Sequence, residues 1–141
     1  MPSEYLQAVR RPGQAVNALF AFLGVEVVGI EPGRAVLRLP VKPTLTQGAG
    51  MAAGGVMATL LDEAMAHAVL AGNSPGEMTT TVDMNVSYLR PVGPGALLDC
   101  EARVVKRGGR VVFAEAVLRA DGRDAARATA TFLLIGAENN R

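Results

Sequence analysis

The sequence predicts a two-layer α+β domain in which an antiparallel sheet wraps around one long central helix. A helical pattern runs without a breaker from Gly54 to Ala71, two strand-like segments precede it, and four follow it. The later joints are short and contain glycine, as tight hairpins require. Helices and strands therefore occur in separate runs, which is typical of antiparallel α+β domains. The 141 residues are enough for a single domain with a sizeable core.

The remaining elements follow from periodicity and from Gly and Pro residues that interrupt it. Residues 1–12 are expected to be a loosely held lead-in and residues 136–141 a flexible, frayed tail. Between them we expect a helix at 14–23, strands at 25–30 and 34–39, the central helix, and strands at 79–89, 97–106, 110–120 and 125–134. Small residues on one face of the last strand (Ala126, Ala128 and Ala130) would let a helix lie close to the sheet.

The strand at 79–89 shows the clearest alternation in the chain. Its pattern predicts Val82, Met84, Val86 and Tyr88 on one face, and Thr81, Asp83, Asn85 and Ser87 on the other.

Composition excludes several classes of protein. The formal net charge is +1 and only six residues are aromatic, so no basic surface indicates nucleic acid as a partner. The single cysteine, Cys100, excludes an intramolecular disulfide and suits a reducing cytoplasm. The apolar stretch at 15–28 is too short to span a bilayer. One His and one Cys, far apart, do not make a typical zinc site. We therefore expect a cytoplasmic protein without a metal, a nucleic-acid partner or a membrane span.

The central helix carries the strongest functional candidate. Met57, Leu61, Ala64, Met65 and Ala68 share one face, while Thr59, Asp62, Glu63 and His67 lie on the opposite arc. With so few polar positions the helix should be largely enclosed, and an enclosed carboxylate is costly unless it is paired or has a function. Asp62 is the carboxylate that we single out.

The start of this helix offers hydrogen-bond donors. The first turn of a helix has free backbone N–H groups, and Gly54 and Gly55 have no side chains to block a carbonyl oxygen from reaching them. Such donors stabilise an oxygen that becomes negative in a transition state. Asp62 lies eight residues further on and can attack as a nucleophile or activate water. Gln47, in the preceding glycine-rich loop, is placed to hold that water or the carbonyl.

Two motifs resemble the hotdog-fold acyl-CoA thioesterases of the PaaI-like (phenylacetic acid degradation) family. They are Gln47-x-x-Gly50-x-x-Ala53-Gly54-Gly55 followed by Asp62, and the strand from Thr80 to Tyr88. The resemblance implies that Gly54 N–H polarises the thioester carbonyl and that Asp62 of the facing subunit is nucleophile or general base. Thr81 would help to place the water, and Gln47 would take the position of the family's Asn. A homodimer, and commonly a dimer of dimers (a homotetramer), would then be needed.

Residues implied in substrate binding flank this constellation. Gly55 and Ala53 border the donor, and CoA, which enters as part of the substrate rather than as a cofactor, needs cations for its phosphates. Candidate cations at strand ends are Arg90, Lys106, Arg107 and Arg110. Ala53 stands where the family usually has His. That departure supports a second hypothesis, a non-catalytic hotdog protein that binds an acyl-CoA or a related ligand.

Other catalytic classes fit the residues less well. Asp62 and His67 have the five-residue spacing of hotdog enoyl-CoA hydratases, but on an unbroken helix the two side chains diverge by about 140°. No Gly-x-Ser-x-Gly elbow occurs, and Cys100 lies among apolar strand neighbours. The identity of the acyl group stays open. The resemblance favours an aryl group, since a branch of the family that acts on aromatic acyl-CoA has Gln at the position of Gln47, while abundant Val, Met and Ala suit aliphatic chains.

Overall fold

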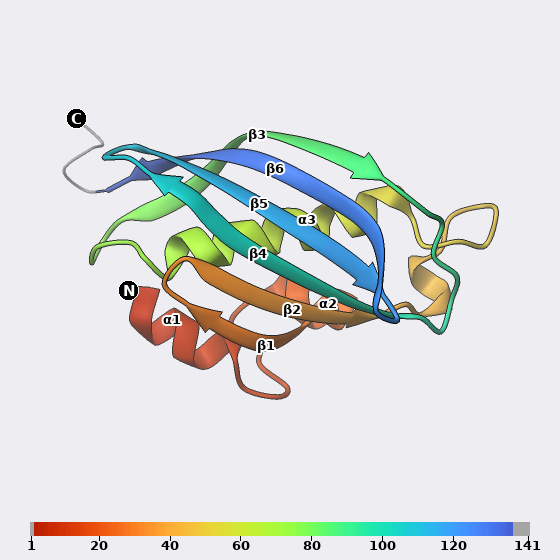
Figure 1. Cartoon of the computed structure of the whole chain (residues 1–141). Helices are drawn as coiled ribbons and strands as arrows, with labels where there is room; N and C mark the ends of the chain where they lie inside the picture. Colours follow the sequence, from red (N-terminus) through yellow and green to blue (C-terminus); the bar gives the residue numbers. More distant parts are fainter. Residues whose placement is uncertain (1, 137–141) are drawn as a thin grey trace.

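A six-stranded antiparallel sheet curves around one long helix, α3, in the computed structural model, which describes residues 2–136 (Figure 1). The elements in chain order are α1 (Pro2–Val9), α2 (Ala18–Leu23), β1 (Glu26–Glu31), β2 (Arg34–Pro40), a short 3-10 helix (Pro43–Leu45), α3 (Gly54–Leu70), β3 (Met78–Tyr88), β4 (Leu97–Arg107), β5 (Val111–Ala120) and β6 (Arg123–Ile135). The strand order is β1-β2-β4-β5-β6-β3, so β1 and β3 are the edges. The predicted α+β class is confirmed. None of the helices in the described residues is long and apolar enough to cross a membrane.

The central helix packs against the sheet with its predicted apolar face. Met57, Leu61, Ala64, Met65 and Ala68 are all at most 4% exposed. The alanines of β6 that were expected to accommodate a helix are buried as well, and α3 contacts β6. Because a methyl group is the only side chain at these positions, the helix can approach the sheet closely. This contact fixes the orientation of α3 and of its polar residues.

The N-terminal segment differs from the expectation of a loosely held lead-in. Residues 2–9 form α1, and Leu6 and Val9 are buried in the common core. Arg10 then donates hydrogen bonds to the carbonyl oxygens of Leu6 and Ile30, which ties the end of α1 to β1. The tail expected to fray lies, from residue 137 onward, outside the described residues.

The second helix is shorter than the 14–23 that its pattern predicts. Asn17 precedes α2 in an extended conformation, and its side-chain oxygen accepts the backbone N–H of Phe20 at 3.0 Å. An asparagine that caps in this way satisfies a free N–H group and starts the helix after itself. Consequently Val16 lies before the helix and is 51% exposed.

The face assignment for β3 is partly wrong, because the strand contains a bulge. Its register against β6 shifts between Thr81 and Asp83, which leaves Val82 as an extra residue. Thr81 lies opposite the buried Phe132 and so faces the helix, whereas Val82 is 60% exposed. Met84 and Val86 face the core as predicted. The bulge therefore moves Thr81 to the helix side.

Candidate active site

Asp62 lies in the middle of α3 and contacts the edge strand β3. Thr81 Oγ1 donates a hydrogen bond of 2.8 Å to Asp62 Oδ1. Asp62 is half-buried, so the enclosure expected for this carboxylate is only partial. Within residues 2–136 this is the one hydrogen bond that the carboxylate accepts. A carboxylate that one hydroxyl orients, and that stays accessible, can take a proton from water or attack a carbonyl carbon.

The first turn of α3 presents free donors at the predicted place. Ala53 is the N-cap residue, with φ −65° and ψ 136°, and its side chain makes no capping hydrogen bond. In the described part of the chain the N–H groups of Gly54 and Gly55 have no acceptor. Tyr88 Oη donates a hydrogen bond of 2.7 Å to the carbonyl oxygen of Gly54, which anchors the helix start to the end of β3. Sequence reasoning placed Tyr88 in the strand motif but did not assign this contact.

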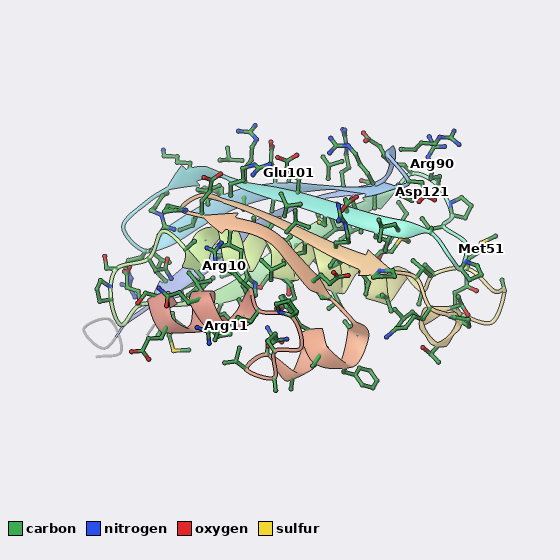
Figure 2. The ribbon with its side chains drawn as sticks, turned by 90° about the horizontal axis from the view of Figure 1, so that it is seen from below. Arg10, Arg11, Met51, Arg90, Glu101 and Asp121 are labelled. Atoms are coloured by element: carbon green, nitrogen blue, oxygen red, sulfur yellow. The ribbon has the colours of Figure 1, made fainter. Side chains whose placement is uncertain are left out.

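A groove of about 390 Å³ borders these donors, with Gly54, Tyr88, Met51, Arg90 and Gln47 among its lining residues. Figure 2 shows Met51 and Arg90 at the same end of the molecule, far from Arg10 and Arg11. Gln47 lines the groove, but its side-chain oxygen accepts the backbone N–H of Ala49 within its own loop. The structure thus brings Gln47 near Gly54 and not near Asp62.

Gly54 and Asp62 of one chain are too far apart to act on the same carbonyl group. Eight residues of continuous helix separate them, which corresponds to about 12 Å along the axis at 1.5 Å per residue. A reacting carbon must lie within about 3–3.5 Å of an attacking group. A reaction that used both groups on one carbonyl would therefore have to take the donor and the carboxylate from two different chains.

The four candidate cations fall into two groups at opposite ends of α3. Arg90 borders the groove at the N-terminal end. Arg107 lies at the C-terminal end, where it donates to the carbonyl oxygen of Val69 at 2.6 Å and to Asn73 Oδ1 at 3.0 Å. Its guanidinium caps the helix, a structural role that the helix dipole favours. Lys106 and Arg110 are exposed in the same β4–β5 region as Arg107.

A buried polar chain links α3 to the N-terminal segment. His67, only 4% exposed, places Nδ1 at 2.7 Å from the carbonyl oxygen of Glu63 and Nε2 at 2.8 Å from Tyr5 Oη. A carbonyl only accepts, so Nδ1 carries the proton and Nε2 accepts from Tyr5. Asn17 Nδ2 in turn donates to Tyr5 Oη at 2.8 Å. Burial lowers the pKa of His67, which agrees with a neutral ring.

Glu63 is the acidic residue whose surroundings sequence reasoning missed. Burial, and secondarily the charge of Asp62, raises its pKa from 4.5 to about 7. The two carboxylates are neighbours in α3, and Glu63 lies on the side that faces Tyr5 and His67. No local pattern signals this, because the cavity that Glu63 lines also includes Tyr5 and Thr79, which are distant from it in the sequence.

The raised pKa of Glu63 has a consequence for stability. The folded protein binds this proton more tightly than the unfolded chain, so the free energy of unfolding should fall as pH rises from about 4.5 to about 7 and then level off. The contribution is about 1 to 3 kcal/mol, at 1.36 kcal/mol per pH unit with a discount for partial exposure. Urea unfolding at pH 5 and pH 8 should show a smaller decline for Glu63→Gln than for the native protein. Equal declines would contradict the assignment.

Two alternative catalytic groups are held apart from the candidate site. Cys100 is fully buried, and burial raises the pKa of its thiol, which makes it a poor nucleophile. His67 and Asp62, the pair with the hydratase spacing, have different partners: His67 bonds to α1 and Asp62 to β3.

Comparison with known proteins identifies the family and the fold of the chain. Residues 49–126, which include Gly54, Asp62 and Thr81, match the thioesterase superfamily. Human acyl-coenzyme A thioesterase 13 is 30% identical over 89 residues, 63% of each chain. A thioesterase family protein from Silicibacter pomeroyi superimposes with a TM-score of 0.82 at 30% identity, covering 94% of this chain and 99% of that one. A variant of the phenylacetic acid degradation protein PaaI from Thermus thermophilus gives a TM-score of 0.78 at 26% identity, covering 83% and 98%. The resemblance to PaaI-like hotdog proteins is confirmed, and the chain belongs to the thioesterase superfamily.

Proposed function

We propose that this protein hydrolyses an acyl-CoA thioester to the free acid and CoA. The observation that carries the proposal is the accessible Asp62 carboxylate, oriented by Thr81, in a fold whose central helix begins with free N–H donors. Membership of the thioesterase superfamily and the likeness to an acyl-coenzyme A thioesterase support it.

The proposed reaction assigns one role to each group. The Gly54 N–H donates to the thioester carbonyl oxygen and stabilises the negative charge that develops there. Asp62 either attacks the carbonyl carbon, giving an anhydride that water then cleaves, or removes a proton from a water molecule that attacks instead. In both routes the C–S bond breaks and CoA leaves as the thiolate. Thr81 keeps Asp62 in place, and no metal ion or separate cofactor takes part.

A homodimer joined through β3 would supply both halves of the site. β3 is an edge strand, and its outer backbone groups are free to pair with another strand. Two-fold antiparallel pairing of β3 with its copy, centred near residues 84–85, would place Thr81 of one chain opposite Tyr88 of the other. Asp62 contacts Thr81, and Gly54 contacts Tyr88. The donor of one chain would then face the carboxylate of the other. Two such dimers would form the tetramer.

The proposed CoA contacts centre on Arg90. It borders the groove at Gly54 and is exposed, as a phosphate ligand must be. Lys106 and Arg110, at the other end of α3, are candidates for a partner's CoA. Arg107 is the weakest candidate, because two α3-side acceptors already hold its guanidinium. We place the activity in the cytoplasm, which the single cysteine suits.

The second candidate function is a binding protein without turnover, and Ala53 is the observation that favours it. No imidazole stands beside Gly54, and the Ala53 side chain makes no capping hydrogen bond there.

Thiol release from a panel of acyl-CoAs, aromatic and aliphatic, separates the two functions. The thioesterase proposal expects turnover of at least one member, with initial rates proportional to protein concentration. Calorimetric titration with CoA runs in parallel. CoA binding with no turnover across the panel would favour the binding protein, and Ala53→His would then be the variant that restores the missing side chain.

A further inference from the structure

Tyr88 lies at the candidate site but has no role in the reaction proposed above. It is the last residue of β3 and pairs with the buried Ala126 of β6, which directs its ring to the side of the sheet that α3 covers. Its hydroxyl donates to the carbonyl oxygen of Gly54 at 2.7 Å, while the residue stays 50% exposed. The ring also lines the groove beside Gly54. The contact between the end of β3 and the first turn of α3 therefore borders the surface where the thioester would bind.

The hydrogen bond from Tyr88 acts on the peptide group that joins Gly54 to Gly55. The C–N bond of a peptide group has partial double-bond character, so its carbonyl oxygen and its N–H group are electronically coupled. A donor at the Gly54 oxygen draws electron density toward that oxygen and makes the Gly55 N–H a stronger donor, because hydrogen bonds in a chain polarise one another. Among the described residues the Gly55 N–H has no acceptor. It can therefore donate to a bound carbonyl oxygen.

Position 55 leaves room for such an oxygen. Gly55 lies within α3 and does not have a positive φ, so its backbone conformation does not require glycine. A Cβ at this position would meet no heavy atom of the described residues within 4 Å. Glycine is less favourable than alanine in a helix, so the absence of a side chain here needs another reason. Open access to the N–H supplies that reason. At Gly54, by contrast, a Cβ would touch the Tyr88 ring at 3.4 Å.

We infer that Tyr88 is a positioning residue for thioester hydrolysis. Its hydroxyl holds the peptide group between Gly54 and Gly55 and strengthens the Gly55 N–H, which donates to the thioester oxygen together with the Gly54 N–H. This inference rests on the proposed thioesterase function and adds a second donor to the site. The oxygen carries more negative charge in the transition state than in the substrate. A stronger donor therefore raises kcat more than it lowers KM.

Tyr88→Phe removes the hydroxyl and keeps the ring beside Gly54. On the best substrate of the acyl-CoA panel, kcat should fall by roughly fivefold to tenfold, the effect of about one hydrogen bond, while KM changes little. Tyr88→3-fluorotyrosine keeps both the ring and the hydroxyl but makes the hydroxyl a stronger donor. At a pH where the phenol stays neutral, this variant should raise kcat, and it tests the inference even if Tyr88→Phe folds poorly.

Thr59→Val is the matched control, because Thr59 Oγ1 donates to the next carbonyl oxygen of α3, that of Gly55, at 2.9 Å. The peptide group that this bond polarises carries the N–H of Val56, which already donates to the carbonyl oxygen of Ala53 at 3.0 Å. Valine has nearly the shape of threonine. The variant thus removes a hydroxyl from a peptide group that has no free N–H, and kcat should stay close to the native value.

A spectroscopic measurement separates polarisation of the thioester from a purely structural effect on α3. The sample is the Asp62→Asn protein, which should bind the same substrate but turn it over slowly, with a ¹³C label at the thioester carbonyl. Stronger donors move the infrared band of this carbonyl to lower frequency, because they polarise the C=O bond. Adding Tyr88→Phe should reverse part of that shift, and adding Thr59→Val should leave the band where it is.

Three results would overturn the role of Tyr88 and leave the thioesterase proposal intact. They are a native kcat in both Tyr88 variants, a carbonyl band that Tyr88→Phe does not move, and an equal loss of kcat in Thr59→Val. A shift in the acidic limb of the pH–kcat profile of Tyr88→Phe would also count against it, since that limb reports the catalytic carboxylate and the hydroxyl would then act on Asp62. No turnover on any panel member would remove the thioesterase function, and this inference with it.

Discussion

Asp62→Asn is expected to lower kcat for thioester hydrolysis by about 10²–10⁴-fold, the contribution typical of a general base and the lower bound for a nucleophile. Asparagine keeps the shape of the side chain and an oxygen that accepts the hydrogen bond from Thr81 Oγ1. The contact between α3 and β3 therefore survives, and the change removes only the negative charge. Thiol-release kinetics on the substrate found in the panel measure the effect, and calorimetry checks that CoA still binds.

Thr81→Val should lower the activity as well, but by less than Asp62→Asn. It removes the hydroxyl that orients Asp62 but leaves the carboxylate, so kcat should fall by about tenfold, equivalent to one hydrogen bond to a charged group. Circular dichroism and gel filtration should match the native protein for both variants. An Asp62→Asn protein that keeps a tenth or more of the native kcat would exclude Asp62 as base or nucleophile.

Gly54→Pro is expected to reduce kcat by about 10²–10³-fold, because it deletes one N–H donor to the oxyanion. Proline is favoured at the first position of a helix, where its missing N–H breaks no helical hydrogen bond. Ala53, at φ −65° and ψ 136°, already has the extended conformation that a residue before proline prefers. The helix should therefore form as before.

The matched control for this variant is Gly54→Ala. A Cβ at position 54 meets the Tyr88 ring at 3.4 Å, and both variants carry that atom, but only alanine keeps the N–H group. Gly54→Ala should retain most of the activity. Equal losses in the two variants would assign the effect to crowding against Tyr88 and not to the donor.

Mixing the two inactive variants tests whether the site is shared between chains. In a dimer of one Asp62→Asn chain and one Gly54→Pro chain, one of the two shared sites has both native groups. Random pairing should then restore about a quarter of the native activity. If each chain held its own complete site, every site in the mixture would carry one defect and no activity would return.

The sequence predicted most of the architecture because the signals for it are local. Strand bounds agree within about two residues, and α3 starts at Gly54 as expected. The patterns that predict them, namely alternation in strands, periodicity in helices and glycine residues at turns, each involve residues close in the sequence. The relation between Gly54 and Asp62 also follows from spacing alone on an unbroken helix.

What the sequence did not predict depends on distant contacts or on exact backbone geometry. α1 is stable because Leu6 and Val9 join a core made by the rest of the chain. Glu63 has a raised pKa because it is largely buried and lies beside Asp62, and the cavity around it is lined by residues distant in the sequence. Gln47 turns its oxygen to Ala49, a choice that no spacing encodes. The face of Thr81 was misjudged because alternation assumes a regular strand.

The surplus residue at Val82 determines how the length of this segment can vary. From Thr81 to Tyr88 the chain takes seven steps along β3 while β6 takes six, from Phe132 to Ala126. The hydrogen bonds from Thr81 to Asp62 and from Tyr88 to Gly54 fix both ends of this segment of β3. Only the bulge residue, Val82, can therefore be deleted without breaking one of them. Losing Val82 would leave an ordinary strand with both contacts in place. An inserted residue would require a second β-bulge between Thr81 and Tyr88. Homologous chains should therefore tolerate shortening here and resist lengthening.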